Sequence, residues 1–97
     1  MPDVKILTTI EDCVAFGKIL SNARKVKLLH ELSKGPISKA KIALMLGIKP
    51  STVHEYIVEM ISAGLVEDYP SLANGGKSFV RMVKSKCETI TINLSNM

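Results

Sequence analysis

The chain has 97 residues, a length that predicts one domain (residues 1–97) with a modest core and excludes two. Hydrophobic residues make up 46% of it, which excludes a disordered chain. Two Phe, two Tyr and no Trp argue against a protein that stacks single-stranded nucleic acid on exposed rings. Thirteen Lys and Arg against nine Asp and Glu give a net charge of +4, which favours a polyanionic partner.

This charge is unevenly distributed along the chain. Residues 34–54 contain four lysines and no acid, and residues 55–76 contain four acids and no base. From Lys77 onward basic residues dominate again. Two basic segments therefore flank an acidic one, a pattern that indicates a localised basic footprint.

The first part of the chain is predicted to be mainly helical. Residues 2–7 alternate apolar and polar side chains, as an extended arm or a weak strand does. Thr8 followed by Glu11 fits a capping box and predicts a helix that ends near residue 20. Asn22 is a favourable cap for a second helix over residues 23–32.

Residues 38–63 predict two helices joined by a tight turn. Ser38 caps the first, Gly47 makes the turn, and Pro50 occupies the first position of the second, where its missing N–H is not needed. Ala63-Gly64 ends it. Across the four helices, the side chains expected to face the core recur at helical spacing: Ile10, Val14, Phe16, Leu20, Val26, Leu28, Leu29, Leu32, Ile42, Ala43, Leu44, Leu46, Val53, Ile57, Met60 and Ile61.

The last third of the chain predicts strands. Residues 65–69 and 77–84 form a hairpin, and the link over 70–76 contains an Asn-Gly turn signal. Residues 87–94 alternate apolar and polar side chains and predict a further strand. This order is that of an α+β, mainly α, winged helix-turn-helix with a β-hairpin wing (residues 65–84) and an additional terminal strand.

A helix-turn-helix presents its second helix to the major groove of DNA and lays its first across the phosphate backbone. We expect short polar side chains near the start of the second helix to reach bases, and lysines before it and on the wing to hold phosphates. The candidate DNA contacts are Ser38, Lys39, Lys41, Lys49, Ser51, Thr52, His54, Glu55, Lys77, Ser78 and Arg81.

The acids of the second helix leave two interpretations open. Glu55 could accept from a cytosine amino group, or Glu55 and Glu59 could lie on a flank away from the duplex. Neither Arg nor Lys lies within this helix, so direct guanine readout by it is not expected. The alternative function is a protein-interaction module whose acidic docking face consists of Glu55, Glu59, Glu67 and Asp68.

Other functional classes find little support in the sequence. His30 and His54 lack a nucleophile or carboxylate at a recognised spacing, and no phosphate-binding loop is present, so an enzyme is not expected. Cys13 and Cys87 form no metal-ligand motif. We interpret them as partly buried thiols, with a disulfide or a thiol-responsive switch as the alternatives. No cofactor or metal is predicted, no signal peptide or membrane segment is visible, and a cytoplasmic protein is expected.

Two segments resemble the small winged-helix regulators of the ArsR type. Residues 20–29 read L-S-N-A-R-K-V-K-L-L and resemble the start of that family's second helix. Residues 51–53 (S-T-V) resemble part of its recognition helix, and residues 63–66 (A-G-L-V) resemble the end of that helix and the segment after it. The resemblance covers about residues 10–84. It implies a homodimer that binds a pseudo-palindromic operator in double-stranded DNA, usually as a repressor. The identity of any small-molecule effector is left open by the sequence.

The chain departs from this family in two places. Metal-sensing members carry cysteines in the helix before the recognition helix, whereas residues 42–46 contain none, so metal sensing there is not implied. Members commonly end in a dimerising helix, whereas this chain ends in the strand over 87–94. Dimerisation is therefore expected through the first helix and the terminal strands, with these contacts: Val4, Ile6, Val14, Ile90, Ile92 and Leu94.

Overall fold

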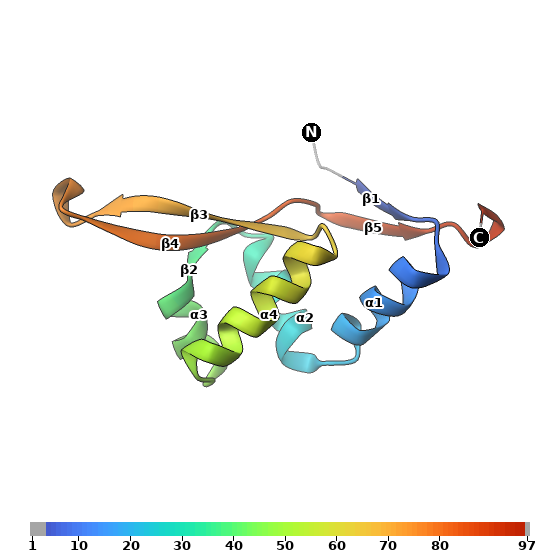
Figure 1. Ribbon diagram of the computed structural model, residues 1–97, viewed down its shortest axis with the longest axis horizontal. Helices are drawn as coiled ribbons and strands as arrows, with labels where there is room; N and C mark the ends of the chain where they lie inside the picture. Colours follow the sequence, from blue (N-terminus) through green and yellow to red (C-terminus); the bar gives the residue numbers. More distant parts are fainter. Residues whose placement is uncertain (1–3, 97) are drawn as a thin grey trace.

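The computed structural model describes residues 4–96 and places four helices beneath a long ribbon of strands (Figure 1). The helices within this range are α1 (Ile10–Leu20), α2 (Ala23–Leu32), α3 (Lys39–Leu46) and α4 (Pro50–Ser62). The strands are β1 (Val4–Leu7), β2 (Ile37–Ser38), β3 (Val66–Ala73), β4 (Ser78–Ser85) and β5 (Thr89–Ile92). Two short 3₁₀ turns are η1 (Asn74–Gly76) and η2 (Leu94–Asn96). The predicted α+β winged-helix fold is confirmed.

Local capping explains where the first three helices begin. Asn22 Oδ1 accepts hydrogen bonds from the backbone N–H groups of Arg24 and Lys25 at 2.9 and 3.2 Å, as the sequence predicted for α2. Ser38 Oγ caps α3 in the same way. The prediction for α1 was wrong by one residue: Thr9, not Thr8, is the cap, and its Oγ1 accepts from the N–H of Asp12 at 3.1 Å.

The two helices of the helix-turn-helix meet at Gly47, as predicted. Gly47 ends α3 with φ 65°, a left-handed conformation that glycine adopts without strain. Pro50 then opens α4 at its first turn. At the other end of α4, Gly64 has φ 73° and turns the chain into β3.

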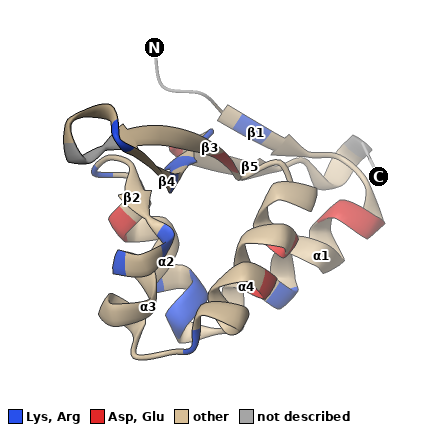
Figure 2. Cartoon of the chain, turned by 60° about the vertical axis from the view of Figure 1, so that its left-hand side comes forward, with Lys and Arg blue, Asp and Glu red and all other residues tan. Residues whose placement is uncertain are grey.

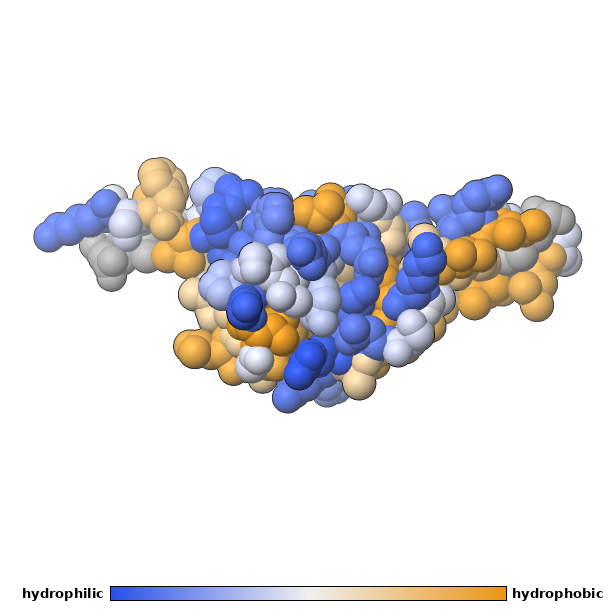
Figure 3. Space-filling view, turned by 60° about the horizontal axis from the view of Figure 1, so that its bottom comes forward, coloured by the Kyte–Doolittle hydropathy of each residue, from blue (hydrophilic) through white to orange (hydrophobic). Residues whose placement is uncertain are grey.

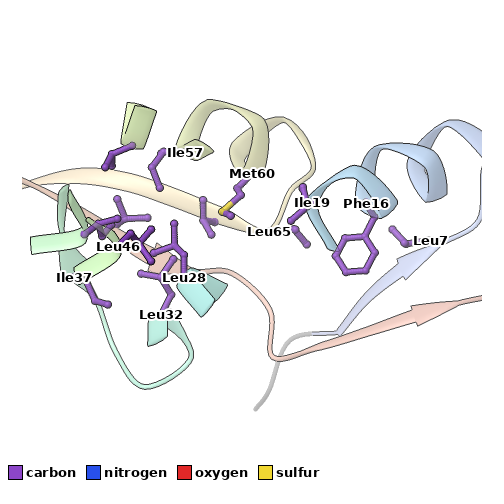
Figure 4. Close-up of a cluster of buried hydrophobic side chains, with 14 residues drawn as sticks. Leu7, Phe16, Ile19, Leu28, Leu32, Ile37, Leu46, Ile57, Met60 and Leu65 are labelled. Atoms are coloured by element: carbon purple, nitrogen blue, oxygen red, sulfur yellow. The ribbon is translucent and has the colours of Figure 1, made fainter. Parts of the chain in front are cut away.

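The core lies between the helices and the sheet, and it is entirely apolar (Figure 4). Ile19, Leu28, Ile42, Ile57 and Val83 are among its fully buried members, so all four helices and the wing contribute to it. Within the described residues no polar side chain is buried.

Six of the side chains predicted to face the core are exposed instead: Ile10, Val14, Leu20, Val26, Leu44 and Ile61. In α1 the structure buries Phe16 and Ile19, although the sequence had favoured the face that carries Ile10 and Val14. The sequence of α1 offers two apolar faces, and only packing against neighbouring elements selects one of them.

The first strand of the wing is longer than the predicted strand over residues 65–69, although the wing as a whole has nearly the predicted bounds. β3 runs through Pro70 to Ala73, so the link between the two strands, which was expected over residues 70–76, consists only of η1 and Lys77. The strand order β2-β4-β3 leaves β3 at the edge of the sheet, where proline is tolerated because one side of the strand needs no ladder bond. Pairing of Leu72 with Phe79 and of Ala73 with Ser78 extends the hairpin beyond the helices.

A separate two-stranded sheet lies at the opposite end of the molecule from the tip of the wing (Figure 1). β1 and β5 pair in parallel, with Val4 opposite Thr89 and Leu7 opposite Ile92. The sheet also reaches α4: Lys5 Nζ lies 3.1 Å from the position that a Cβ on Gly64 would occupy. A cation beside the C-terminal end of a helix is favourable, so Lys5 helps to join this sheet to α4.

Candidate nucleic-acid interface

The N-terminal end of α4, α3 and the wing lie at one end of the molecule (Figure 1). In the first turns of α4, Ser51 and His54 are exposed and Thr52 is half-buried, while Val53 faces the core. Ser51 and His54 therefore lie on the accessible side of this helix, and Thr52 lies at its margin. Its N-terminal N–H groups add a partial positive charge at the same place.

Two lysines of the helix-turn-helix are available to an anion. Lys41 in α3 and Lys49 immediately before α4 are exposed, and neither forms an ion pair with a carboxylate in residues 4–96. Figure 2 shows further basic positions in α2 and the wing. Lys77, beside the turn of the wing, is also exposed and is not ion-paired within the described part of the chain.

Two other predicted phosphate contacts are already paired. Lys39 Nζ and an Arg81 Nη lie 3.2 and 2.8 Å from the same oxygen, Asp68 Oδ2. The hydrogen bond from Arg81 lowers the pKa of Asp68 below its ordinary value of 3.8, and Lys39 acts in the same direction. Asp68 therefore joins α3 to both strands of the wing and neutralises part of the charge there, which the sequence did not predict.

The acidic residues do not form one face. Glu59 pairs with Lys25 of α2 at 2.7 Å, and this ammonium also lies 5.2 Å from the centre of the Tyr56 ring. Glu67 pairs with Lys84 at 2.9 Å. Because Glu67 and Asp68 are adjacent in β3, their side chains point to opposite faces of the hairpin. The acidic docking face that the alternative function needs is thus divided among three surfaces.

Glu59 and Glu55 have different surroundings within α4. The ion pair with Lys25 turns Glu59 toward α2, which agrees with the interpretation that places it on a flank. Glu55 remains exposed near the accessible side of the helix. Figure 2 shows the acidic positions of α4 together with the basic ones of α2 and α3.

The hairpin beyond the helices carries two exposed apolar side chains that sequence reasoning missed. Phe79 and Leu72 are 73% and 63% exposed and lie opposite each other on β4 and β3. The sequence had placed Leu72 in a loop, so its pairing with Phe79 could not be anticipated.

The predicted dimer contacts are mostly exposed, but they do not share one face. The apolar surface at the end away from the wing is visible in Figure 3. Val4 and Ile6 point to one face of the β1–β5 sheet, and Ile90 and Ile92 to the other. Ile90 packs partly against the core. Exposed positions of the predicted set are Val4, Ile6, Val14, Ile92 and Leu94.

The two cysteines are half-buried, with Cys13 on α1 and Cys87 between β4 and β5, and both pack against the core. Across residues 4–96, no three His, Cys, Asp or Glu side chains gather closely enough to hold a metal ion. In the same range, no helix has both the length and the apolar character needed to cross a membrane.

Comparison with known proteins places these features in a family context. The sequence model of the family described as "Iron dependent repressor, N-terminal DNA binding domain" matches residues 24–73, slightly more than half of the chain. This match runs from α2 to the end of β3. No curated protein sequence matches the chain.

Several solved structures have the same fold, among them one described as an ArsR family transcriptional regulator, which is 15% identical with a TM-score of 0.63 over 77% of this chain and 76% of that one. A homodimeric winged helix-turn-helix DNA-binding domain from Mycobacterium bovis, described as a possible ArsR-family regulator, is 24% identical, with a TM-score of 0.62 over 78% of this chain and 65% of that one. NolR from Sinorhizobium fredii is 15% identical, with a TM-score of 0.63 over 80% of this chain and 72% of its own. The ArsR-like winged-helix architecture predicted from the sequence is confirmed.

Proposed function

The chain belongs to the family of iron dependent repressor N-terminal DNA binding domains, and on this premise we propose that it is a sequence-specific, homodimeric transcriptional repressor. The family and the fold are those of a winged-helix DNA-binding transcriptional regulator. The observation that carries the specific proposal is the N-terminal end of α4. There Ser51 and His54 are exposed next to Lys49 in the chain, and Lys41 is exposed in the first turn of α3; neither lysine is ion-paired within residues 4–96.

The protein makes two kinds of contact with DNA in this proposal, one with bases and one with phosphates. Ser51, Thr52 and His54 contact base edges or adjacent phosphates in the major groove, while Lys41, Lys49 and Lys77 hold phosphates on either side. Lys39 and Arg81 join them when a phosphate replaces Asp68 as their partner, because both already lie at this surface. Ser38 and Ser78 stay in the proposed contact set as hydroxyl donors, and Glu55 as an acceptor from cytosine.

We propose that α1 forms the centre of the dimer interface. Ile10 and Val14 are 65% and 54% exposed, and an added Cβ on Gly17, on the same side of α1, would meet nothing within 4 Å. This face allows close approach of a second copy of α1. Further exposed apolar side chains at this end lie on both faces of the β1–β5 sheet: Ile92 shares the face of Leu7, whereas Val4 and Ile6 point to the other face. Leu94 is also exposed there. The homodimeric Mycobacterium bovis domain supports a dimer of this fold.

A dimer would place two copies of α4 on successive turns of the duplex, about 34 Å apart. Repression then follows from occupancy of the operator. The iron in the family's name does not enter this proposal, because the described residues do not provide a group of metal ligands. We propose that DNA binding needs no metal and takes place in the cytoplasm.

The proposal is tested by titrating the protein into a fluorescent duplex of random sequence at low and moderate salt. Binding that weakens steeply with salt is expected, because phosphate contacts release counterions. Selection from a random duplex pool should then enrich a two-fold symmetric site. Failure to bind any duplex at low salt would contradict the proposal and favour the protein-interaction alternative.

A further inference from the structure

The far end of the wing exposes an apolar pair that neither the core nor the major-groove contacts use. Leu72 and Phe79 lie opposite each other in the register of β3 and β4 and are 63% and 73% exposed. Large apolar side chains so close to a hairpin tip add nothing to the buried core. Such a pair is therefore suited to an external partner.

The register shows which way this pair points. Side chains at every second position share a face, so Leu72 and Phe79 lie on the same face as Pro70 and Arg81. Two positions further along, Asp68 and Val83 continue that face, and Val83 is fully buried against the helices. The apolar pair therefore projects from the helix-facing side of the wing, beyond the helices themselves. This is the side on which α3 and the start of α4 lie (Figure 1).

Cationic side chains flank the pair along β4. Arg81 is two residues from Phe79 on the same face and is half exposed despite its bond to Asp68. Lys77 lies two residues away in the other direction, beside the turn, and is exposed. An apolar centre between two cations suits the minor groove, whose phosphate walls are negative and whose floor is formed by base edges.

We propose that Phe79, supported by Leu72, is a wedge that enters the minor groove and partly unstacks a base step. Minor-groove proteins commonly use Phe or Leu in this way, and the resulting bend lets more protein surface contact the duplex. The inference rests on the proposed function, because α4 in the adjacent major groove would bring the wing to this position. Arg81 and Lys77 then hold the phosphates on both sides of the opened step.

The size of the pair argues against a protein partner at the same place. Two side chains of this kind bury at most about 400 Å² together. A standard interface between proteins buries about 800 Å² on each partner, about twice that area. A single base step, in contrast, is matched in size to one aromatic ring.

The test uses a duplex of about 30 base pairs of alternating dT and dA, which is rich in easily unstacked steps, with 2-aminopurine replacing selected adenines. Its fluorescence rises when the base is unstacked, while anisotropy of an end label reports binding separately. The variants are Phe79→Ala and Phe79→Leu. Val80→Ala is the matched control, because Val80 lies on the same strand and points to the other face. Because Phe79 is exposed, its replacement leaves the core intact.

We expect wild-type protein to raise 2-aminopurine fluorescence on binding. Phe79→Ala should lose most of this rise and bind about tenfold more weakly, the usual cost of removing one aromatic stacking contact. Phe79→Leu should retain a substantial part of the rise, and Val80→Ala should match the wild type.

Three results would overturn the wedge. Wild-type binding without a fluorescence rise would exclude it while leaving the proposed DNA-binding function in place. A 2-aminopurine fluorescence rise that is unchanged in Phe79→Ala would also exclude the wedge and leave the DNA-binding function in place. A loss of self-association in Phe79→Ala, measured by sedimentation, with unchanged DNA binding would assign the pair to a protein contact. A wild type that binds no duplex at low salt would instead reject the proposed function itself.

Discussion

At one end of the molecule α3, the start of α4 and the wing expose cations and short polar side chains, whereas at the other end α1, β1 and β5 expose aliphatic ones. The polar end already satisfies part of its charge internally, since Asp68 pairs with both Lys39 and Arg81. At the aliphatic end, exposed apolar side chains such as Ile10, Val14 and Ile92 are not covered by another element of the described chain. The two ends therefore suit different partners: the polar end suits a polyanion, and the aliphatic end suits a second copy of the chain.

The largest expected effect comes from placing a charge at the aliphatic end. Val14→Asp would bury an unpaired carboxylate in the α1 interface, so self-association should weaken by at least about a hundredfold. Sedimentation equilibrium measures this directly.

The control for that variant lies at the other end of the molecule. Leu44 is also apolar and is 85% exposed, but it belongs to α3. Leu44→Asp should leave the oligomeric state unchanged. If both variants dimerise like the wild type, or if the wild type is a monomer, α1 is not the dimer interface.

At the polar end, removing an unpaired lysine should weaken DNA binding for every sequence. For Lys49→Ala we expect affinity to fall about fivefold at moderate salt and the salt slope to decrease by about one. Lys77→Ala should behave similarly if the wing contacts phosphates. Lys18→Ala, an exposed lysine of α1, is the matched control and should change neither quantity.

Asp68→Asn should act in the opposite direction. It removes the charge that competes with phosphate for Lys39 and Arg81, so low-salt affinity should rise about threefold and the salt slope should become steeper. The free energy of unfolding should fall by only about 0.5–1 kcal/mol, because the ion pairs are partly exposed. Weaker DNA binding by this variant would show that Asp68 positions the cations rather than competing for them.

The smallest effect is a pH dependence of stability. Arg81 lowers the pKa of Asp68 and Lys84 lowers that of Glu67, so both carboxylates stabilise the fold while ionised. That contribution is complete above the pKa values of the unfolded chain and is lost as pH falls through the lower folded values. Thermal unfolding of Asp68→Asn should therefore depend less steeply on acidic pH than that of the wild type; equal slopes would remove Asp68 as a source of the dependence.

Much of the helical part could be predicted because its signals are local. The Asn22 and Ser38 caps, the left-handed Gly47 and the N-terminal Pro50 each act within about one helical turn of their own position. Adjacent Thr8 and Thr9 are both capable caps, which explains the one-residue error at α1. The exposure of Ser51 and His54 also followed, since Val53 and Ile57 define the buried side of α4.

Tertiary structure alone decided the rest, because it depends on residues distant in the chain. Asp68 meets Lys39 only when β3 packs beside α3, and Leu72 becomes a strand residue only because Phe79 pairs with it. The choice between the two apolar faces of α1 depends in the same way on its neighbours in the fold. Periodicity and capping act over a few residues, so the helices and most of the strands could be located from them. Which side chains pair, face the core or remain exposed depends on long-range packing.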